Sequence, residues 1–205
     1  MTTRESTLSN TSQNLTSQQL CNEPIPIRNG DKPTYKVAYK QLPETLLNFI
    51  CESIWSILRY HPSSYYSVPR KLPGFLHYVT LITRRAQVNR TLALVTLIYV
   101  ERLKKKMPSN SVGDYGFCHR VFTASLLVAY KVLYGEDSYH TPTTHEGPLR
   151  LSSGSLSALT NNLFSPREIS LMERTFLQLI DFNVWVTELD IREFVRINRE
   201  DLILW

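Results

Sequence analysis

One stretch in the middle of the chain decides the fold class: Leu92–Lys106, which reads LALVTLIYVERLKKK. Nearly every position from Leu92 to Val100 is apolar, and a helix that is apolar on all sides must be surrounded by other elements. The stretch ends in Arg102 and Lys104–Lys106, which suit the negative end of a helix dipole. We therefore expect a buried, central helix.

Further helices are predicted on both sides of this stretch, because apolar residues recur there at steps of three or four. They are expected over 42–59, 75–85, 113–134, 156–161, 166–181 and 188–199. The segment 121–130 is apolar on most faces and predicts a second buried helix. The chain has only seven glycines and shows no strand pattern, so the predicted fold class is all-α.

Several helix ends are marked by local signals. In Ser165-Pro166-Arg167-Glu168 the serine can cap a helix, the proline suits the first helical position and the glutamate can complete a capping box. Thr187 is a predicted cap of the last helix, and Gly135 a predicted C-terminal stop.

Composition divides the chain into four parts. Residues 1–40 are rich in Ser, Thr, Asn and Gln and predict a disordered polar arm, since such a segment cannot bury enough surface to offset its ordering entropy. Residues 41–72 predict an N-terminal helix and a proline-broken linker. Residues 73–199 predict the main helical domain, and 200–205 a short tail.

Charge and cysteine content bound the setting of the protein. The net charge of +5 is compatible with an acidic protein partner or with nucleic acid. The three cysteines are widely spaced and predict neither a disulfide framework nor a zinc site, which favours a reducing compartment. We expect no signal peptide and no membrane span, because no apolar stretch approaches the required length of about 20 residues.

Signals for enzymatic chemistry are weak. The sequence contains no phosphate-cradling glycine loop and no nucleophile elbow. Cys118 beside His119 is a poor nucleophile pair, because neighbouring helical residues point apart. His140 and His145 lie in a proline-broken stretch without helical ligand spacing. We predict no catalytic residue, metal, cofactor or small-molecule ligand.

Two charged residues interrupt apolar helix faces. Lys131 follows Val128 by one turn, and Glu173 lies between Ile169 and Phe176. Each side chain either sits at the rim of its apolar stripe and points to water, or flanks an exposed apolar patch that receives a partner helix. In the second case, the ammonium and the carboxylate could pair with free C=O and N–H groups at the ends of that helix.

Three segments resemble the cyclin box. They are Tyr99-Val-Glu-Arg-Leu103, His119-Arg-Val-Phe-Thr-Ala-Ser-Leu-Leu-Val-Ala-Tyr-Lys131 and Leu171-Met-Glu-Arg-Thr-Phe-Leu-Gln-Leu-Ile-Asp-Phe182. The likeness covers about residues 70–195. Thr83-Arg-Arg-Ala-Gln-Val88 looks like the fungal PHO- and PCL-type cyclins in particular.

This resemblance implies a single five-helix box, with an extra helix before it and another after it. It implies a non-catalytic regulatory subunit that binds and activates a cyclin-dependent protein kinase, helps select its substrates and resides in the nucleus and cytoplasm. By the same similarity, Lys131 and Glu173 contact the regulatory helix of the kinase. Roles in the cell cycle, polarity and nutrient signalling are all compatible with the sequence.

The sequence also departs from the family pattern. Residues 139–154 are unlike the stretch that relatives carry between the lysine and glutamate helices. The Met-Arg-x-x-Leu patch of mitotic cyclins is absent near Phe75, so we do not expect Arg-x-Leu peptides to dock. We also expect no second box. Without the family arginine, Glu101 needs a new partner, and we predict an ion pair with Arg120.

A cyclin-fold nucleic-acid-binding module of a transcription factor is the alternative function. Its candidate contacts are Arg84, Arg85, Arg90 and Lys104–Lys106, which can equally be solvated helix ends. Thr141-Pro142 is either a plain turn or a site for phosphorylation by the bound kinase.

Overall fold

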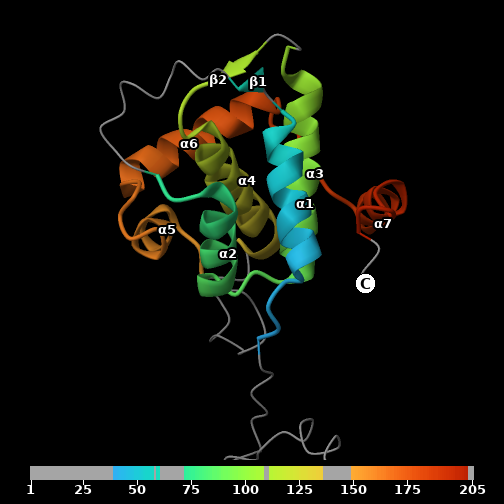
Figure 1. Ribbon diagram of the computed structural model, residues 1–205, viewed down its shortest axis with the longest axis horizontal. Coiled ribbons are helices and arrows are strands. Elements are labelled where there is room, and N and C mark those ends of the chain that lie inside the picture. The colour runs from blue at the N-terminus through green and yellow to red at the C-terminus, as the bar shows by residue number, and fades with distance from the viewer. Residues whose placement is uncertain (1–38, 58, 61–71, 109–110, 136–148, 203–205) are drawn as a thin grey trace, which may run out of the picture. The chain divides into compact units, whose positions relative to one another are not determined.

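The computed structural model describes residues 39–57, 59–60, 72–108, 111–135 and 149–202 (Figure 1). Residues from Tyr39 onward form one compact unit. Its elements in chain order are α1 Glu44–Trp55, β1 Arg59–Tyr60, α2 Phe75–Arg85, α3 Arg90–Lys106, β2 Val112–Gly113, α4 Phe117–Tyr134, α5 Ser153–Leu159, α6 Pro166–Leu179 and α7 Glu188–Ile197. The all-α prediction is confirmed. The predicted arm over 1–40 lies outside the described residues, apart from its last two.

Helix α4 occupies the centre of the unit. It packs against α1, α2, α3 and α6, and α5 packs in turn against α6 (Figure 1). All positions from Val121 to Tyr130 are buried, as are all positions from Leu92 to Val100 on α3. The two helices that the sequence predicted to be buried are therefore the buried ones.

The polar side chains inside these buried stretches are satisfied locally. The hydroxyl of Thr96 donates to the carbonyl oxygen of Leu92 at 2.7 Å, and that of Ser125 donates to the carbonyl oxygen of Phe122 at 3.1 Å. Bonds of this kind remove the cost of burying a hydroxyl group without a partner. Apolar helices can therefore include small polar residues where they pack closely.

The predicted caps are confirmed where α6 and α7 begin. The amide of Glu168 donates to the Ser165 hydroxyl at 3.2 Å, and its carboxylate accepts from the Ser165 amide at 2.7 Å. Thr187 and Asp190 form the same reciprocal arrangement at the start of α7. Both boxes satisfy backbone donors that a helix start would otherwise leave free.

The N-terminal end of α4 differs from the prediction. The sequence predicted a helix from Gly113, but Val112–Gly113 forms a two-residue parallel strand pair with Arg59–Tyr60, and the helix begins at Phe117. Gly116 makes the turn between them with a φ of 84°, a conformation that glycine adopts without steric cost. The expectation of no strands was therefore wrong for these two short segments. The first helix was also predicted to reach residue 59, but α1 ends at Trp55 and Arg59 belongs to the strand.

Two other helix ends are also corrected. A capping box between Ser152 and Ser155 starts α5 at Ser153, three residues before the predicted start. Gly135 follows the last residue of α4 as predicted, but its φ of −63° is right-handed, so it ends the helix without the left-handed geometry of a glycine stop.

Helix α7 lies beside α3 at the edge of the unit (Figure 1). The guanidinium of Arg102 on α3 donates to the carbonyl oxygens of Asn183 at 2.7 Å and Trp185 at 2.8 Å. The Tyr99 hydroxyl donates to the carbonyl oxygen of Val184 at 2.6 Å. These three bonds fix the connection between α6 and α7 to α3. None of the helices in the described part of the chain is long and apolar enough to cross a membrane.

Candidate functional site

The two charged residues singled out in the sequence meet at the surface between α4 and α6. The Lys131 ammonium on α4 bonds both carboxylate oxygens of Glu173 on α6, at 2.6 and 2.8 Å. The lysine side chain is 47% exposed, whereas the glutamate side chain is 14% exposed. The positive end of the pair thus faces solvent and the negative end is largely covered.

Local sequence explains why each charge stands at this border. Glu173 lies between Ile169 and Phe176, which are buried on the core side of α6. Lys131 directly follows the buried stretch of α4 and belongs to its last turn. A carboxylate this close to the core requires a partner, and the lysine supplies one. The first of the two sequence interpretations, in which each side chain points to water by itself, therefore does not describe this pair. The two side chains bond each other.

Apolar side chains border this pair. Val132, next to Lys131 on α4, is exposed, and Leu177, one turn after Glu173 on α6, is half-buried. A charged pair beside apolar groups suits a helical partner, because such a partner presents apolar side chains along its length and free backbone groups at its ends.

A cavity of about 660 Å³ lies on another flank of α6, and no sequence pattern indicated it. Because a helix turns about 100° per residue, the cavity-lining residues Leu171, Thr175 and Leu179 lie on the opposite flank from Glu173 and Leu177. The cavity and the ion pair are therefore separate features of one helix. The space is enclosed by α4, α6 and the segments before α2 and before α4.

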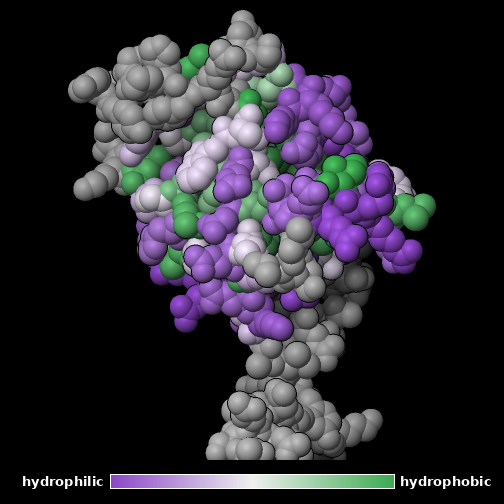
Figure 2. Space-filling model, turned by 45° about the vertical axis from the view of Figure 1, so that its right-hand side comes forward, coloured by the Kyte–Doolittle hydropathy of each residue, from purple (hydrophilic) through white to green (hydrophobic). Residues whose placement is uncertain are grey.

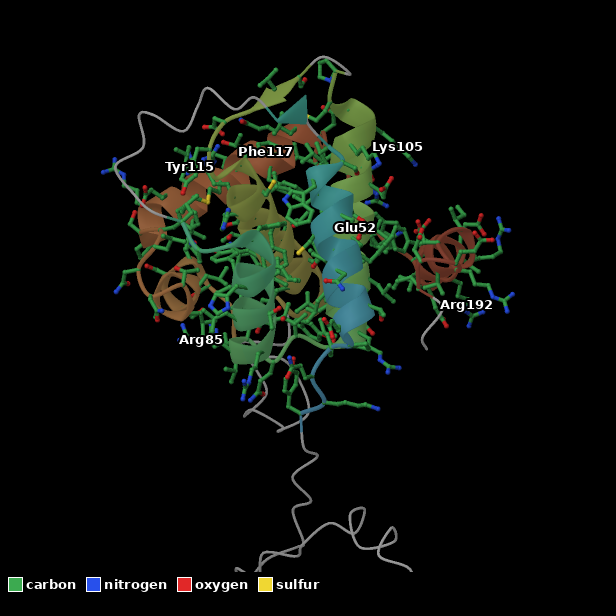
Figure 3. The ribbon with its side chains drawn as sticks, in the orientation of Figure 1. Glu52, Arg85, Lys105, Tyr115, Phe117 and Arg192 are labelled. Atoms are coloured by element: carbon green, nitrogen blue, oxygen red, sulfur yellow. The ribbon has the colours of Figure 1, made fainter. Side chains whose placement is uncertain are left out.

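A second cavity, of about 560 Å³, adjoins the N-terminal end of α4, where Tyr115 and Phe117 lie (Figure 3). Both of these residues line the two cavities, so they form a shared wall. The Tyr115 hydroxyl accepts a hydrogen bond from the amide of Leu72 at 3.0 Å, which joins the wall to the segment before α2.

His119 is a core histidine at the edge of this second cavity. It is 7% exposed, and its ring lies 4.8 Å from that of Tyr78 and 5.2 Å from that of Phe75. Its Nε2 lies 2.9 Å from the carbonyl oxygen of Pro73. Burial lowers the pKa of His119 below its usual value, because the charged form loses its hydration.

Cys51 and Cys118, the cysteines in the described part of the chain, are poor nucleophiles. Burial raises the pKa of Cys51 to about 12 and that of Cys118 to about 11, so both are neutral thiols near pH 7. Among the described residues no group of three His, Cys, Asp or Glu side chains could hold a metal ion. The stretch that contains His140 and His145, and Thr141-Pro142 between them, lies outside those residues.

The predicted ion pair between Glu101 and Arg120 is not formed; both residues are described, and no ion pair joins them. The guanidinium of Arg120 instead bonds the carboxylate of Asp114 and donates to the carbonyl oxygen of Tyr115 at 3.2 Å. Arg120 lies in the first turn of α4 and lines the cavity beside α6, where the loop before α4 folds back over it. This local turn brings Asp114 within reach of the guanidinium.

The basic residues considered for nucleic-acid binding lie at the ends of α2 and α3 and at the start of α3. Arg85 ends α2, far from Lys105 at the end of α3 (Figure 3). Arg85 donates to the carbonyl oxygen of Leu159 at 2.7 Å, and Lys106 pairs with Asp181 at 2.6 Å. Among the described residues these cations are divided among those helix ends, and Arg85 and Lys106 already have partners.

Exposed apolar side chains also occur around α7. Trp185 is 79% exposed, and Leu189 and Ile197 are exposed as well. On the face that Figure 2 brings forward, apolar areas are separated by hydrophilic ones. Apolar residues scattered in this way are ordinary on protein surfaces.

Comparison with curated proteins identifies three relatives, all from Saccharomyces cerevisiae. PHO85 cyclin-1 is 29% identical over 156 residues, which cover 72% of this chain and 47% of the relative. PHO85 cyclin-9 is 23% identical and PHO85 cyclin-2 is 22% identical, each over 74% of this chain and 46% of the relative. The chain thus spans about half the length of these relatives. No family model matches the chain, and no solved structure matches it.

The helical fold agrees with this likeness: over 72–74% of its length the chain is similar to cyclins of PHO85. All three relatives are cyclins of PHO85, the type that the resemblance in the sequence had indicated.

Proposed function

We propose that this chain is a regulatory subunit that binds and activates a cyclin-dependent protein kinase and helps select its substrates. The observation that carries the proposal is the ion pair between Lys131 and Glu173 at the surface between α4 and α6. The relatives support it, since each is named as a cyclin of PHO85.

The pair retains bonding capacity for a partner. A lysine ammonium has three N–H donors, and two of them here reach the Glu173 carboxylate. The third is available for a carbonyl oxygen at a partner's helix end. The carboxylate oxygens have further lone pairs for backbone N–H groups. These groups are the ones that helix ends leave free, and charged partners make strong bonds with them.

Activation then follows from selective binding. The regulatory helix of a protein kinase carries a glutamate that must pair with the ATP-contacting lysine. A subunit that binds this helix only in its active position shifts the kinase toward the active state by the difference between its affinities for the two states. The subunit supplies no catalytic group of its own in this mechanism.

The test measures binding and activation of purified PHO85 from Saccharomyces cerevisiae. We expect Lys131→Ala and Glu173→Ala each to weaken binding by tenfold or more, because each removes one half of a charged contact worth about 2 kcal/mol or more. The fold should remain intact, since a part-exposed ion pair contributes only about 1 kcal/mol or less to stability.

The matched control is Glu193→Ala, which breaks the exposed ion pair between Glu193 and Arg196 on α7. This variant should bind as the unaltered chain does. Equal affinity of all three variants for the kinase would refute the proposed site. If the unaltered chain neither binds nor activates PHO85 or any other cyclin-dependent kinase, the proposed function is wrong.

A further inference from the structure

A side-chain hydrogen bond joins the last turn of α4 to the residue that caps the start of α3. The amide nitrogen Nδ2 of Asn89 donates to the Tyr134 hydroxyl at 2.9 Å. The other end of the same amide, Oδ1, accepts from the backbone N–H of Leu92 at 2.9 Å and caps α3. Asn89 therefore holds two helix ends at once.

Lys131 belongs to the turn that this bond holds. It stands three residues before Tyr134, and its carbonyl oxygen accepts the amide of Gly135 at 2.9 Å, which closes the helix. Terminal turns open more readily than helix interiors, because their last carbonyls have no partner further along the helix. The position of the lysine side chain thus depends on a helix end that needs outside support.

The Tyr134 ring adds packing to this support. It is half-buried, and its centroid lies 5.4 Å from that of Tyr130, one turn earlier. The Tyr130 hydroxyl differs, since it makes no hydrogen bond within the described part of the chain. Both tyrosine rings pack against each other, but of the two hydroxyl groups that of Tyr134 bonds Asn89. Comparing the two residues therefore distinguishes the effect of ring packing from that of the hydrogen bond.

We propose that Tyr134 and Asn89 are positioning residues for kinase binding. Their hydrogen bond keeps the last turn of α4 helical and so holds the Lys131 ammonium against Glu173, where the pair receives the kinase helix. This inference rests on the proposed function. When the turn opens, the binding-competent fraction falls, and the apparent affinity falls with it.

The first experiment compares Tyr134→Phe with its matched control Tyr130→Phe. Loss of one neutral hydrogen bond should weaken binding to purified PHO85 about threefold to tenfold in Tyr134→Phe. The amide of Gly135 should also exchange its hydrogen faster, because the turn opens more often. Tyr130→Phe should leave both quantities unchanged. Unchanged binding and exchange in Tyr134→Phe would overturn the inference.

A second experiment tests whether Tyr134 acts through Lys131. In the Lys131→Ala background, Tyr134→Phe should weaken binding no further, because the group that it positions is gone. An additional loss equal to that in the unaltered chain would show that Tyr134 acts elsewhere, and the inference would fail.

Replacement of Asn89 provides a rescue test. In the Asn89→Asp variant the new carboxylate can accept from the Tyr134 hydroxyl and still cap α3, so this variant should bind as the unaltered chain does. Asn89→Ser keeps a capping oxygen but is too short to reach Tyr134, so it should match Tyr134→Phe. Equal behaviour of the two Asn89 variants would contradict the inference.

These readouts separate the inference from the proposed function. If the unaltered chain binds no kinase, the proposed function fails and positioning for kinase binding fails with it, while the exchange of Gly135 still shows whether the hydrogen bond holds the turn. If Lys131→Ala weakens binding but Tyr134→Phe does not, the proposed function stands and the positioning role is wrong.

Discussion

Replacing Gly116 with alanine should destabilise the fold at the wall between the two cavities. Gly116 has a φ of 84°, and a Cβ atom built on it would lie 2.7 Å from Cδ1 of Leu72. Placing an L-residue in left-handed backbone costs about 1–2 kcal/mol. Displacing the Leu72 side chain from its packed position adds about 1 kcal/mol. The expected loss is therefore about 2–3 kcal/mol of unfolding free energy.

The assay is thermal and urea unfolding followed by circular dichroism. For a domain of this size, a loss of about 2–3 kcal/mol lowers Tm by roughly 4–12 °C. The matched control is Gly74→Ala, because Gly74 has a φ of −55° and a Cβ atom there meets nothing within 4 Å. This control should change the unfolding free energy by less than about 0.5 kcal/mol. Equal unfolding of both variants would refute the reasoning.

Three further predictions concern single side chains. The pKa of His119 is lowered in the fold, so the unfolded chain binds more protons, and stability should fall as pH drops below the usual pKa of 6.5 and stay level above it. The measurement is the difference in unfolding free energy between pH 5.5 and pH 7.5, from urea unfolding. This difference should be smaller in His119→Gln than in the unaltered chain, and unchanged in His77→Gln, which replaces an exposed histidine. The same difference in both variants would contradict the prediction. Ser165→Ala should lower the unfolding free energy by about 1 kcal/mol through loss of the α6 cap, whereas no change in the urea midpoint would show that the cap is dispensable. Cys118, with its pKa raised to about 11, should react with iodoacetamide at pH 8 far more slowly than an unfolded-chain thiol, and reaction at the unfolded rate would exclude its burial.

The helices were predictable because their signals are local. The periodicity of apolar residues and the box of Ser165 and Glu168 involve positions only three or four apart, and these positions meet in any helix. The limits of α2 were predicted correctly for this reason. The start of α4 was not, because the pairing of Val112–Gly113 joins residues more than fifty positions apart. Nothing in the local pattern indicates such a partner.

The candidate site shows the same division. The sequence alone singled out Lys131 and Glu173 as charges beside apolar faces, and family resemblance supplied their role in kinase binding, which stays a prediction. It also paired Arg120 with Glu101, because both were expected on neighbouring helices. In the structure Arg120 pairs with Asp114 instead, because the loop before α4 places that carboxylate next to the guanidinium.

By itself, the sequence determined which segments are helical, which two of them are buried and which charges interrupt apolar faces. Tertiary structure alone decided that Lys131 bonds Glu173 across 42 positions, that Asn89 bonds Tyr134 across 45, and that a cavity opens beside α6. The physical reason is that helix formation depends on neighbours along the chain. Which side chains meet between helices depends instead on the angle and register at which the helices pack.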